Sequence, residues 1–392
     1  MVLNVVIMAA GKGTRMRSAR PKVMHTLAGR ALLQHVLTAA AGLGATRTLV
    51  VTGHGAEAVE AAFRSPTIAF VRQEPQLGTG HALQQAAPRL AGDDGTTLIL
   101  NGDVPLIEPS TLRALVDASA GQRLALLTVT LADPSGYGRI VRASGAAIEA
   151  IVEDKDASAD QRAIAEVYTG AMAAPTKALR RWLVALSNDN AAGEYYLTDV
   201  VGLAVAEGTP VVGAAAGSET EVLGVNSAGQ LAMLERRLQA AEAARLMEAG
   251  VRLADPARID VRGELACASD VEIDVGCIFE GRVTLGDGAR IGAYCVIRNA
   301  DIGAGAVLRP FSHVDGEALG ASVGERASVG PYARLRGGAR LGADVHIGNF
   351  VEVKNASLGR GAKANHLAYV GDASLGERVN FGAGSITANY DG

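Results

Sequence analysis

The chain has two parts that differ in their pattern of hydrophobic and polar positions. Up to about residue 225, short apolar runs alternate with amphipathic stretches. The runs LNVVIMAA, TLVVTG, TIAFV and TLILNGD predict buried parallel strands, and the stretches 31–44, 55–64, 79–90 and 109–119 predict helices between them. Strands that alternate with helices are typical of a wound α/β sheet, so this half is predicted to be a Rossmann-like domain.

After about residue 251, aliphatic residues recur every six positions. A helix repeats at 3.6 residues and a half-buried strand at 2, so neither explains a period of six. The period is typical of the hexapeptide repeat of a parallel β-helix, in which one aliphatic side chain per short strand points inward. The stretch 303–322 breaks the period and predicts a loop or an irregular coil. The longest unbroken series is Val323, Val329, Leu335, Leu341, Ile347 and Val353.

A single helix is predicted between the two halves. Residues 227–250 contain no proline, and Leu231, Leu234 and Leu238 fall on one helical face. The expected organisation is therefore an α/β domain at 1–226, a connector helix at 227–250 and a β-helix domain at 251–392.

The composition argues against several classes of protein and partner. The chain is 48% apolar and 20% charged with a formal net charge of −4. Nucleic acids and anionic membranes need a basic excess, so we expect neither as a partner. The first apolar run, at 2–10, is too short to span a bilayer and lacks the features of a signal peptide, which leaves the cytoplasm as the expected compartment.

The loop AAGKGTRMRSARPK, directly after the first strand, predicts an anion site. It fits neither the Walker A spacing nor the dinucleotide pattern GxGxxG, because Met16 stands at the last glycine. Lys12, Arg15 and Lys22 lie within eleven residues, which suits a triphosphate or a leaving pyrophosphate. The alternative for GKGTR alone is a solvated basic turn.

Two further stretches of the first half carry candidate chemistry. In LILNGDVPL an apolar strand ends at Asp103, where a carboxylate could hold a magnesium ion that bridges phosphates, or simply cap a turn. In QEPQLGTG, glutamine amides could pair with a base edge while Gly78 lets the backbone approach; alone, this signal is weak.

Together these motifs resemble a known family. AAGKGTRMRSARPKVMHTLAG is similar to the signature of sugar-1-phosphate nucleotidylyltransferases. With QLGTGHA, NGDVPL, GYGRI, GEYYLTD, GVN and the hexapeptide half, essentially the whole chain resembles the bacterial bifunctional N-acetylglucosamine-1-phosphate uridylyltransferases that are also glucosamine-1-phosphate N-acetyltransferases. The resemblance implies a left-handed β-helix, a homotrimer, Mg²⁺ as cofactor, and UTP, N-acetylglucosamine-1-phosphate, glucosamine-1-phosphate and acetyl-CoA as substrates.

The resemblance also implies roles for residues of the first half. Arg15 would steady the departing pyrophosphate, Lys22 would neutralise charge between the two phosphates, and Asp103 with Asn226 would bind magnesium. The remaining expected contacts with the triphosphate, the uracil and the sugar are Gly11, Lys12, Gly13, Gln73, Gln76, Gly78, Thr79, Gly138, Glu153 and Tyr168.

Two positions depart from the family pattern. Asn101 stands where the family usually has tyrosine, and Tyr168 stands where a sugar-contacting asparagine is usual. The exact contact with the sugar or ribose is therefore open. A large gain in activity on replacing Tyr168 with asparagine would mark the tyrosine as a defect.

In the second half the resemblance implies an acetyl-acceptor site. His366 would be the general base, because the amine of glucosamine must lose a proton as it attacks the thioester. The other implied contacts are Arg336, Lys354, Tyr369, Asn380, Asn389 and Tyr390.

The sequence ends at Gly392, within the hexapeptide rhythm. The family's β-helix continues beyond this point with most acetyl-CoA contacts, so we expect active uridylyl transfer and weak or absent acetyl transfer. The alternatives are a monofunctional sugar-1-phosphate nucleotidylyltransferase and a non-catalytic scaffold subunit, which would be expected to lack Arg15, Lys22 or Asp103.

Overall fold

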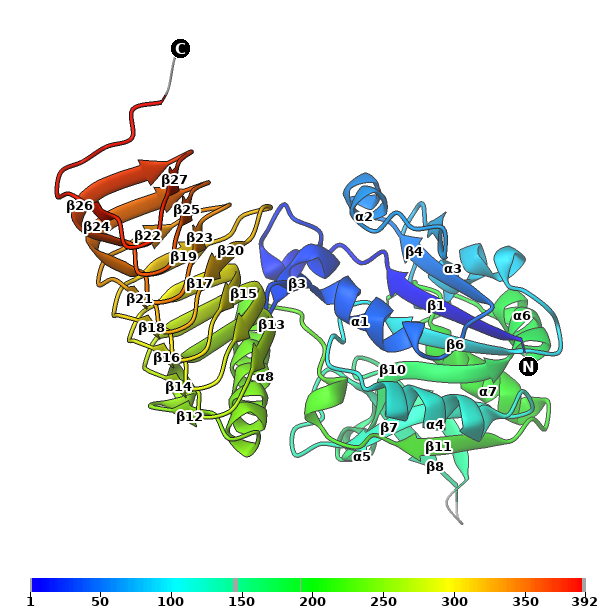
Figure 1. The fold of residues 1–392 in the computed structure, drawn as a ribbon. Helices are drawn as coiled ribbons and strands as arrows, with labels where there is room; N and C mark the ends of the chain where they lie inside the picture. The colour runs from blue at the N-terminus through cyan, green and yellow to red at the C-terminus, as the bar shows by residue number, and fades with distance from the viewer. Residues whose placement is uncertain (1, 144–146, 191, 390–392) are drawn as a thin grey trace. The chain divides into compact units, whose positions relative to one another are not determined.

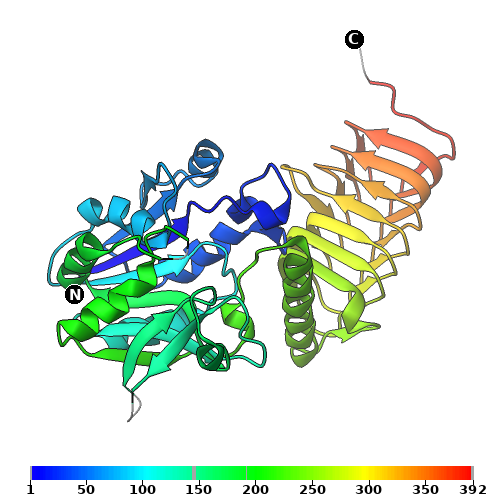
Figure 2. The ribbon, with the colours of Figure 1, turned by 180° about the vertical axis from the view of Figure 1, so that it is seen from behind.

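The computed structural model describes residues 2–143, 147–190 and 192–389. The chain forms two compact units, one of Met1–Leu27 with Ala31–Leu234 and the other of Ala28–Arg30 with Glu235–Gly392 (Figures 1 and 2). The division falls inside helix α8 (Ala228–Glu248). The domain boundaries expected from the sequence stay predictions.

The first unit is built on one mixed sheet with the central order β11-β7-β10-β6-β1-β4-β5. The four strands expected from the sequence are β1, β6, β4 and β5, and they pair in parallel as predicted. Strand β10 was not expected and runs antiparallel to both β6 and β7. The strands are β1 (Leu3–Ala9), β4 (Arg47–Thr52), β5 (Ile68–Arg72), β6 (Thr96–Asn101), β7 (Leu124–Thr130), β10 (Glu166–Pro175) and β11 (Val211–Ala215).

Helices cover both faces of this sheet (Figure 1). One face packs against α1 (Leu32–Ala41), α2 (Ala56–Ala62) and α4 (Pro109–Ser119). The other packs against α3 (Thr79–Ala86), α6 (Thr176–Ala185) and α7 (Val200–Ala206). All four predicted helical stretches are confirmed. No helix in the described part of the chain is long and apolar enough to cross a membrane.

A hairpin extends the sheet next to β10. It consists of β8 (Gly138–Arg142), which pairs with β10, and β9 (Ile148–Val152), followed by the short helix α5 (Ala159–Arg162). Gly138 and Glu153, both expected at the sugar pocket, lie on or next to this hairpin.

The second unit is a parallel β-helix, in which the strands of neighbouring coils pair in parallel (Figures 1 and 2). The fold class predicted from the period of six is confirmed. Its strands are β12 (Arg252–Leu253), β13 (Ile259–Cys267), β14 (Glu272–Ile273), β15 (Cys277–Leu285), β16 (Arg290–Ile291), β17 (Val296–Ile302), β18 (Val307–Leu308), β19 (His313–Asp315), β20 (Ala321–Val323), β21 (Ser328–Val329), β22 (Arg334–Leu335), β23 (Arg340–Leu341), β24 (His346–Lys354), β25 (Ser357–Leu358), β26 (Lys363–Gly371), β27 (Ser374–Leu375) and β28 (Asn380–Phe381).

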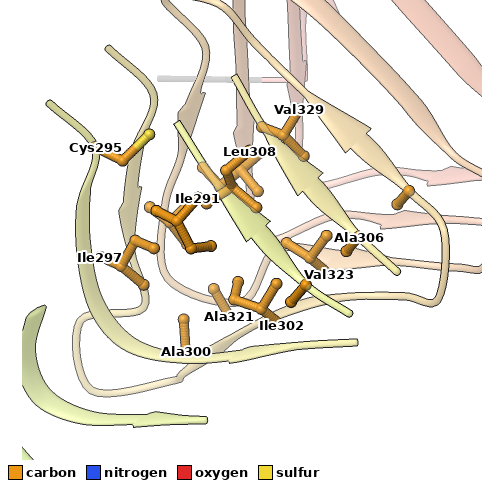
Figure 3. Packing of buried hydrophobic residues seen from close by; sticks show 14 of the residues in the cluster. Ile291, Cys295, Ile297, Ala300, Ile302, Ala306, Leu308, Ala321, Val323 and Val329 are labelled. Atoms are coloured by element: carbon orange, nitrogen blue, oxygen red, sulfur yellow. The ribbon is translucent and has the colours of Figure 1, made fainter. Parts of the chain in front are cut away.

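The residues of the six-residue period form the β-helix core. Figure 3 shows aliphatic side chains of successive coils stacked inside: Ile291, Leu308 and Val329 follow one another on one side, and Ile302 and Val323 on another. Every member of the series from Val323 to Val353 is buried. The irregular coil expected at 303–322 is also confirmed. The coil from Ala300 to its partner Ala321 is three residues longer than the coil from Ser322 to its partner Arg340. The turn before β20 holds the extra residues.

The second part of α8 covers the first coils of the β-helix. The buried Gln239 side chain donates to the carbonyl oxygen of Val261 and accepts from its N–H, both at 2.8 Å. Ala243 and Leu246 belong to the same core cluster as Val251 and Val261. The helix therefore satisfies backbone groups and covers apolar side chains that an uncapped coil would expose.

A column of glycines at one corner lets successive coils approach each other. A Cβ on Gly324 would collide with the backbone carbon of Gly342 and lie 2.6 Å from its carbonyl oxygen. Backbone cannot move aside as a side chain can, so the coils would have to separate. The column consists of Gly286, Gly303, Gly324, Gly342, Gly359 and Gly376.

We expect Gly324→Ala to lower the free energy of unfolding of the β-helix by about 1–3 kcal/mol, the usual cost of overpacking. Gly376→Ala is the matched control, because a Cβ there meets only Val379 Cγ2 at 3.8 Å. Urea unfolding monitored by circular dichroism measures both. Equal stabilities of the two variants would contradict the close-approach argument.

Candidate functional site

The glycine-lysine loop folds back over Lys22. Strand β1 runs into the loop, which continues through the 3₁₀ turns η1 (Thr14–Met16) and η2 (Lys22–Met24). Gly13 has a φ of 60° and a Cβ there would lie 2.8 Å from Cβ of Lys22, so glycine is required on both counts. Lys12 and Arg15 are exposed on the loop. A Cβ on Gly11 would have no other atom within 4 Å, so the space beside the backbone is open at this position.

Three side chains from distant parts of the sequence meet beneath this loop. Lys22 Nζ donates to Asp103 Oδ2 and, at 3.1 Å, to Asn226 Oδ1. Asp103 follows strand β6, and its carbonyl oxygen accepts from the N–H of Val225 at 2.9 Å, which fastens the segment that carries Asn226. The N–H of Asn226 in turn donates to Gln230 Oε1 at 2.8 Å. The side chains of Lys22 and Asp103 are only 15% and 16% exposed, so their charges face each other with little water between them.

The Asp103–Asn226 pair is suited to a magnesium ion. A carboxylate and an amide oxygen already converge on one cation, the Lys22 ammonium, and both are the hard oxygen donors that Mg²⁺ prefers. No three His, Cys, Asp or Glu side chains cluster as metal ligands within residues 2–143, 147–190 and 192–389. A metal held by Asp103 and Asn226 would therefore complete its coordination with water and phosphate oxygens, as Mg²⁺ commonly does.

A cavity of about 440 Å³ opens next to this cluster. Its walls come from the end of β6, residues 168–170 of β10, the β8–β9 hairpin and the segment that leads into α8. Of the residues expected from the sequence, those that line it are Arg15, Thr79, Asp103, Gly138, Glu153, Tyr168 and Asn226. The expected sugar pocket and the expected metal ligands thus share one cavity.

Burial shifts the pKa values of one carboxyl and one phenol group in the wall. Burial raises the pKa of Glu153 above its usual range, against the hydrogen bond that Thr198 Oγ1 donates to Glu153 Oε1 at 2.9 Å. Burial also raises the pKa of Tyr168, and the nearby Glu153 adds to the shift. The Tyr168 hydroxyl is buried and has no hydrogen-bond partner among the described residues.

The two departures from the family pattern lie on neighbouring strands of the same wall. Asn101 ends β6, and a Cβ on Gly170 of β10 would clash with the Asn101 amide nitrogen. Gly170 has a φ of 92°, and the register of β10 shifts between Tyr168 and Met172. Asn101 and Tyr168 both line the cavity.

The stretch expected to contact uracil is held by hydrogen bonds within its own loop and to the GEYYLTD segment. The buried Gln73 donates from Nε2 to the carbonyl oxygen of Gly78 at 2.9 Å, so its amide nitrogen is bound to its own loop. Gly80 N–H donates to the Tyr195 carbonyl oxygen at 2.7 Å, and Leu197 N–H donates to Thr79 Oγ1 at 3.0 Å. The GEYYLTD segment therefore fixes the shape of this loop.

The positions of the two glutamines differ. Gln76 Nε2 lies 2.6 Å from a Cβ built on Gly53, close to Ala10 at the end of β1. Gln76 thus lies near the anion loop, whereas Gln73 shapes the backbone of its own loop. A direct contact of Gln73 or Gln76 with uracil stays a prediction.

In the second unit, the expected acceptor residues Arg336, Lys354 and Tyr369 lie on consecutive coils of one face. Arg336 Nη1 contacts Glu352 Oε1 at 3.1 Å, and Tyr369 is the register partner of Glu352 one coil further on. Lys354 lies 3.7 Å from Asp372. The Glu352 carboxylate raises the pKa of Arg336 through this hydrogen bond, which keeps the guanidinium charged.

The other expected acceptor residues are more scattered. Asn389 Nδ2 donates to the carbonyl oxygens of Gly371 and Asp372 at 2.8 and 3.0 Å. Asn380 lies on β28, where it pairs with Lys363 on a different face of the coil from Arg336 and Lys354. Tyr390 lies outside the described residues. A common site for these residues stays a prediction.

Sequence reasoning missed three polar side chains that hold expected site residues. Gln230 binds the backbone of Asn226, Thr198 donates to Glu153, and Asn349 Oδ1 lies 2.9 Å from His366 Nδ1. Ser227 and Gln230 match the Ser-x-x-Gln pattern of a helix start, and Ser227 Oγ accepts from Gln230 N–H at 3.2 Å. That pattern was the available signal for Gln230. Thr198 lies in the GEYYLTD motif, but nothing in the motif distinguished it from its neighbours.

Comparisons with known proteins agree with both units. The MobA-like NTP transferase domain family matches residues 5–170. Proteins described as "Bifunctional protein GlmU" align with the whole chain and 85% of their own length, at 71% identity in Methylibium petroleiphilum and 60% in Burkholderia thailandensis. A crystal structure of UDP-glucose pyrophosphorylase complexed with UDP-glucose covers 61% of this chain and 98% of its own, at a TM-score of 0.53 and 17% identity, which shows a shared fold.

Proposed function

The chain belongs to the family of bifunctional GlmU proteins, and from this membership we propose that it catalyses two transfers. The first unit transfers UMP from UTP to N-acetylglucosamine-1-phosphate, giving UDP-N-acetylglucosamine and pyrophosphate. The second unit transfers the acetyl group of acetyl-CoA to the amine of glucosamine-1-phosphate. The convergence of Lys22, Asp103 and Asn226 at the edge of the cavity is the observation that carries the first assignment.

Uridylyl transfer requires positioning and charge neutralisation rather than a covalent intermediate. An oxygen of the sugar phosphate bonds to the α-phosphorus of UTP as the bond to the β-phosphate oxygen breaks. Lys22 lowers the repulsion between the two anions, and Arg15 on the exposed loop steadies the pyrophosphate that leaves. Asp103 and Asn226 hold Mg²⁺, which supplies further neutralisation of the phosphate charge when bound.

The sugar is held in the cavity by Gly138, Glu153 and Tyr168. A Cβ on Gly138 would collide with Ile151 Cγ2 at 2.6 Å, and Gly138 lies beside Glu153, whose carboxylate oxygens are 3.8 Å from that Cβ position. The buried Tyr168 hydroxyl has a hydrogen to donate and no partner among the described residues. A sugar oxygen would satisfy that hydroxyl, so Tyr168 replaces an asparagine contact with a longer side chain.

Acetyl transfer needs a base at the amine of the acceptor. The amine attacks the thioester carbonyl, the carbon–sulfur bond breaks and coenzyme A leaves as a thiolate, which becomes the thiol by taking up the proton that the amine has given to the base. His366 accepts the proton that the amine loses, while Arg336 and Lys354 bind the phosphate of glucosamine-1-phosphate. We expect the protein to act as a homotrimer, which light scattering of the purified chain measures.

Two parallel assays test the proposed function. Pyrophosphate release is measured from UTP and N-acetylglucosamine-1-phosphate with and without Mg²⁺, and thiol release from acetyl-CoA and glucosamine-1-phosphate. Metal-dependent pyrophosphate release is expected, and its absence in a folded protein would overturn the first assignment. Thiol release is expected as well, and its absence in a folded protein would overturn the second assignment.

We expect Tyr168→Phe to have opposite effects on stability and on substrate binding. An unpartnered buried hydroxyl costs about 1–3 kcal/mol, so its removal should stabilise the free protein. Loss of the hydrogen bond to the sugar should raise the KM for N-acetylglucosamine-1-phosphate about tenfold. Thermal unfolding and steady-state kinetics measure the two effects.

Tyr137→Phe is the matched control for Tyr168→Phe. Tyr137 lines the same cavity, but its hydroxyl is hydrogen-bonded to the backbone of Gly224. Its removal should therefore destabilise the protein. If Tyr168→Phe also destabilised the protein and left the KM unchanged, the hydroxyl would have a structural partner and no role toward the sugar.

A further inference from the structure

We propose that Asn349 is a positioning residue for acetyl transfer, which fixes the tautomer of the general base His366. The inference rests on the proposed role of His366. Asn349 Oδ1 accepts a hydrogen bond from Nδ1–H of His366 at 2.9 Å and thereby leaves the lone pair of Nε2 available for the proton of the attacking amine.

The β-helix register brings these two residues together. Asn349 on β24 and His366 on β26 are partners in a parallel ladder, so their side chains leave adjacent coils in the same direction. Each directly precedes a residue with positive φ, Phe350 at 58° and Leu367 at 46°. Both side chains therefore stand at the same place of the coil, immediately before the same corner.

Close approach of the coils at this place depends on Gly348. A Cβ on Gly348 would clash with the carbonyl oxygen of Asn365 in the next coil. Because the residues before Asn349 and His366 lie against each other backbone to backbone, the two side chains are held at hydrogen-bonding distance. The contact is thus built into the packing of the coils.

The orientation of the Asn349 amide has a chemical consequence. A neutral imidazole carries one N–H, and only the other nitrogen can accept a proton. With the amide oxygen toward His366, the hydrogen is on Nδ1 and Nε2 can act as a base. With the amide nitrogen toward the ring, Nδ1 would be the acceptor, and Nε2 would carry the hydrogen and could not accept the amine proton.

The tautomer can be measured without catalysis. The ¹⁵N chemical shifts of the His366 ring are recorded in the full chain at a pH where the ring is neutral, and assigned by comparison with His366→Gln. We expect the Nδ1–H form in the unmodified protein, a shift toward the Nε2–H form in Asn349→Leu, and the Nδ1–H form again in Asn349→Asp, whose carboxylate can only accept. An Nε2–H ring in the unmodified protein, or a tautomer that Asn349→Leu leaves unchanged, would overturn the proposal.

Ser357→Ala is the matched control. Ser357 Oγ donates to Ser374 Oγ at 2.9 Å, which is also a side-chain hydrogen bond between adjacent coils but does not involve His366. We expect the control to leave the tautomer and the acetyl-transfer rate unchanged. A change of tautomer in Ser357→Ala would mean that any loosening of the coils has the same effect, and would remove the specific role of Asn349.

Kinetics link the tautomer to the reaction. We expect Asn349→Leu to lower kcat for thiol release about 10- to 100-fold with little change in the KM for glucosamine-1-phosphate, and Asn349→Asp to recover most of the rate. A change of tautomer in Asn349→Leu without a lower kcat would show that the tautomer of His366 does not limit acetyl transfer. Retention of full acetyl transfer by His366→Ala would instead overturn the proposed base, and the two failures are distinguishable because the tautomer is read separately.

Discussion

Replacing Lys22 with methionine is expected to lower kcat/KM for uridylyl transfer by at least about 1,000-fold, or roughly 4 kcal/mol of transition-state stabilisation. Asp103 and Asn226 place the Lys22 ammonium next to the cavity, where it can neutralise charge as the bond from the α-phosphorus to pyrophosphate breaks. Methionine has a similar length and fills the same space, but it carries no charge and donates no hydrogen bond. The effect therefore measures the charge rather than packing.

Lys12→Met is the comparison for Lys22→Met. Lys12 lies in the same loop but is exposed, so water screens its charge. We expect a loss of about tenfold for Lys12→Met. Pyrophosphate release measures both variants, while thiol release and thermal unfolding show that each chain is folded. Equal losses for the two lysines would mean that the loop acts through its overall charge, and that the Asp103–Asn226–Lys22 cluster has no special role.

The fold was largely predictable because burial imposes periods on the sequence. Strands β1, β4, β5 and β6 are short apolar runs, and the β-helix core requires an aliphatic residue every six positions. The direction of a strand imposes no period on the sequence. Strand β10 is apolar like its neighbours, yet it runs antiparallel to β6 and β7, and nothing in its composition distinguishes the two directions.

The candidate site was predictable only in part. Convergence of Asp103 and Asn226 came from the family resemblance, since 122 residues lie between them and spacing alone cannot bring them together. Gln73 illustrates the opposite case: a glutamine in a glycine-containing loop can bind a ligand or its own backbone, and the structure shows the bond to Gly78. A sequence does not distinguish a polar side chain that binds its own backbone from one that binds a ligand.

Asn349 became identifiable only with the register of the coils. The six-residue period suggests coils of eighteen residues, as between Ser328 and His346. The next coil is one residue shorter, because His346 pairs with Lys363, and this difference places Asn349 rather than Gly348 beside His366. A strict eighteen-residue repeat would have paired His366 with the wrong residue, and a glycine has no side chain to orient a base.

His366→Ala is expected to lower kcat for acetyl transfer by about 100- to 10,000-fold, the usual contribution of a general base, and to leave uridylyl transfer unchanged. Without the imidazole, the amine must lose its proton to water or hydroxide, so the residual rate should keep rising as the pH is raised. Thiol release between pH 6 and 9 measures this profile, and pyrophosphate release in the same preparation is the internal control. Lys22→Met should show the reverse pattern, with uridylyl transfer lost and acetyl transfer kept. If His366→Ala impaired both reactions equally, the variant would have damaged the fold, and if it impaired neither, the proton would have another acceptor.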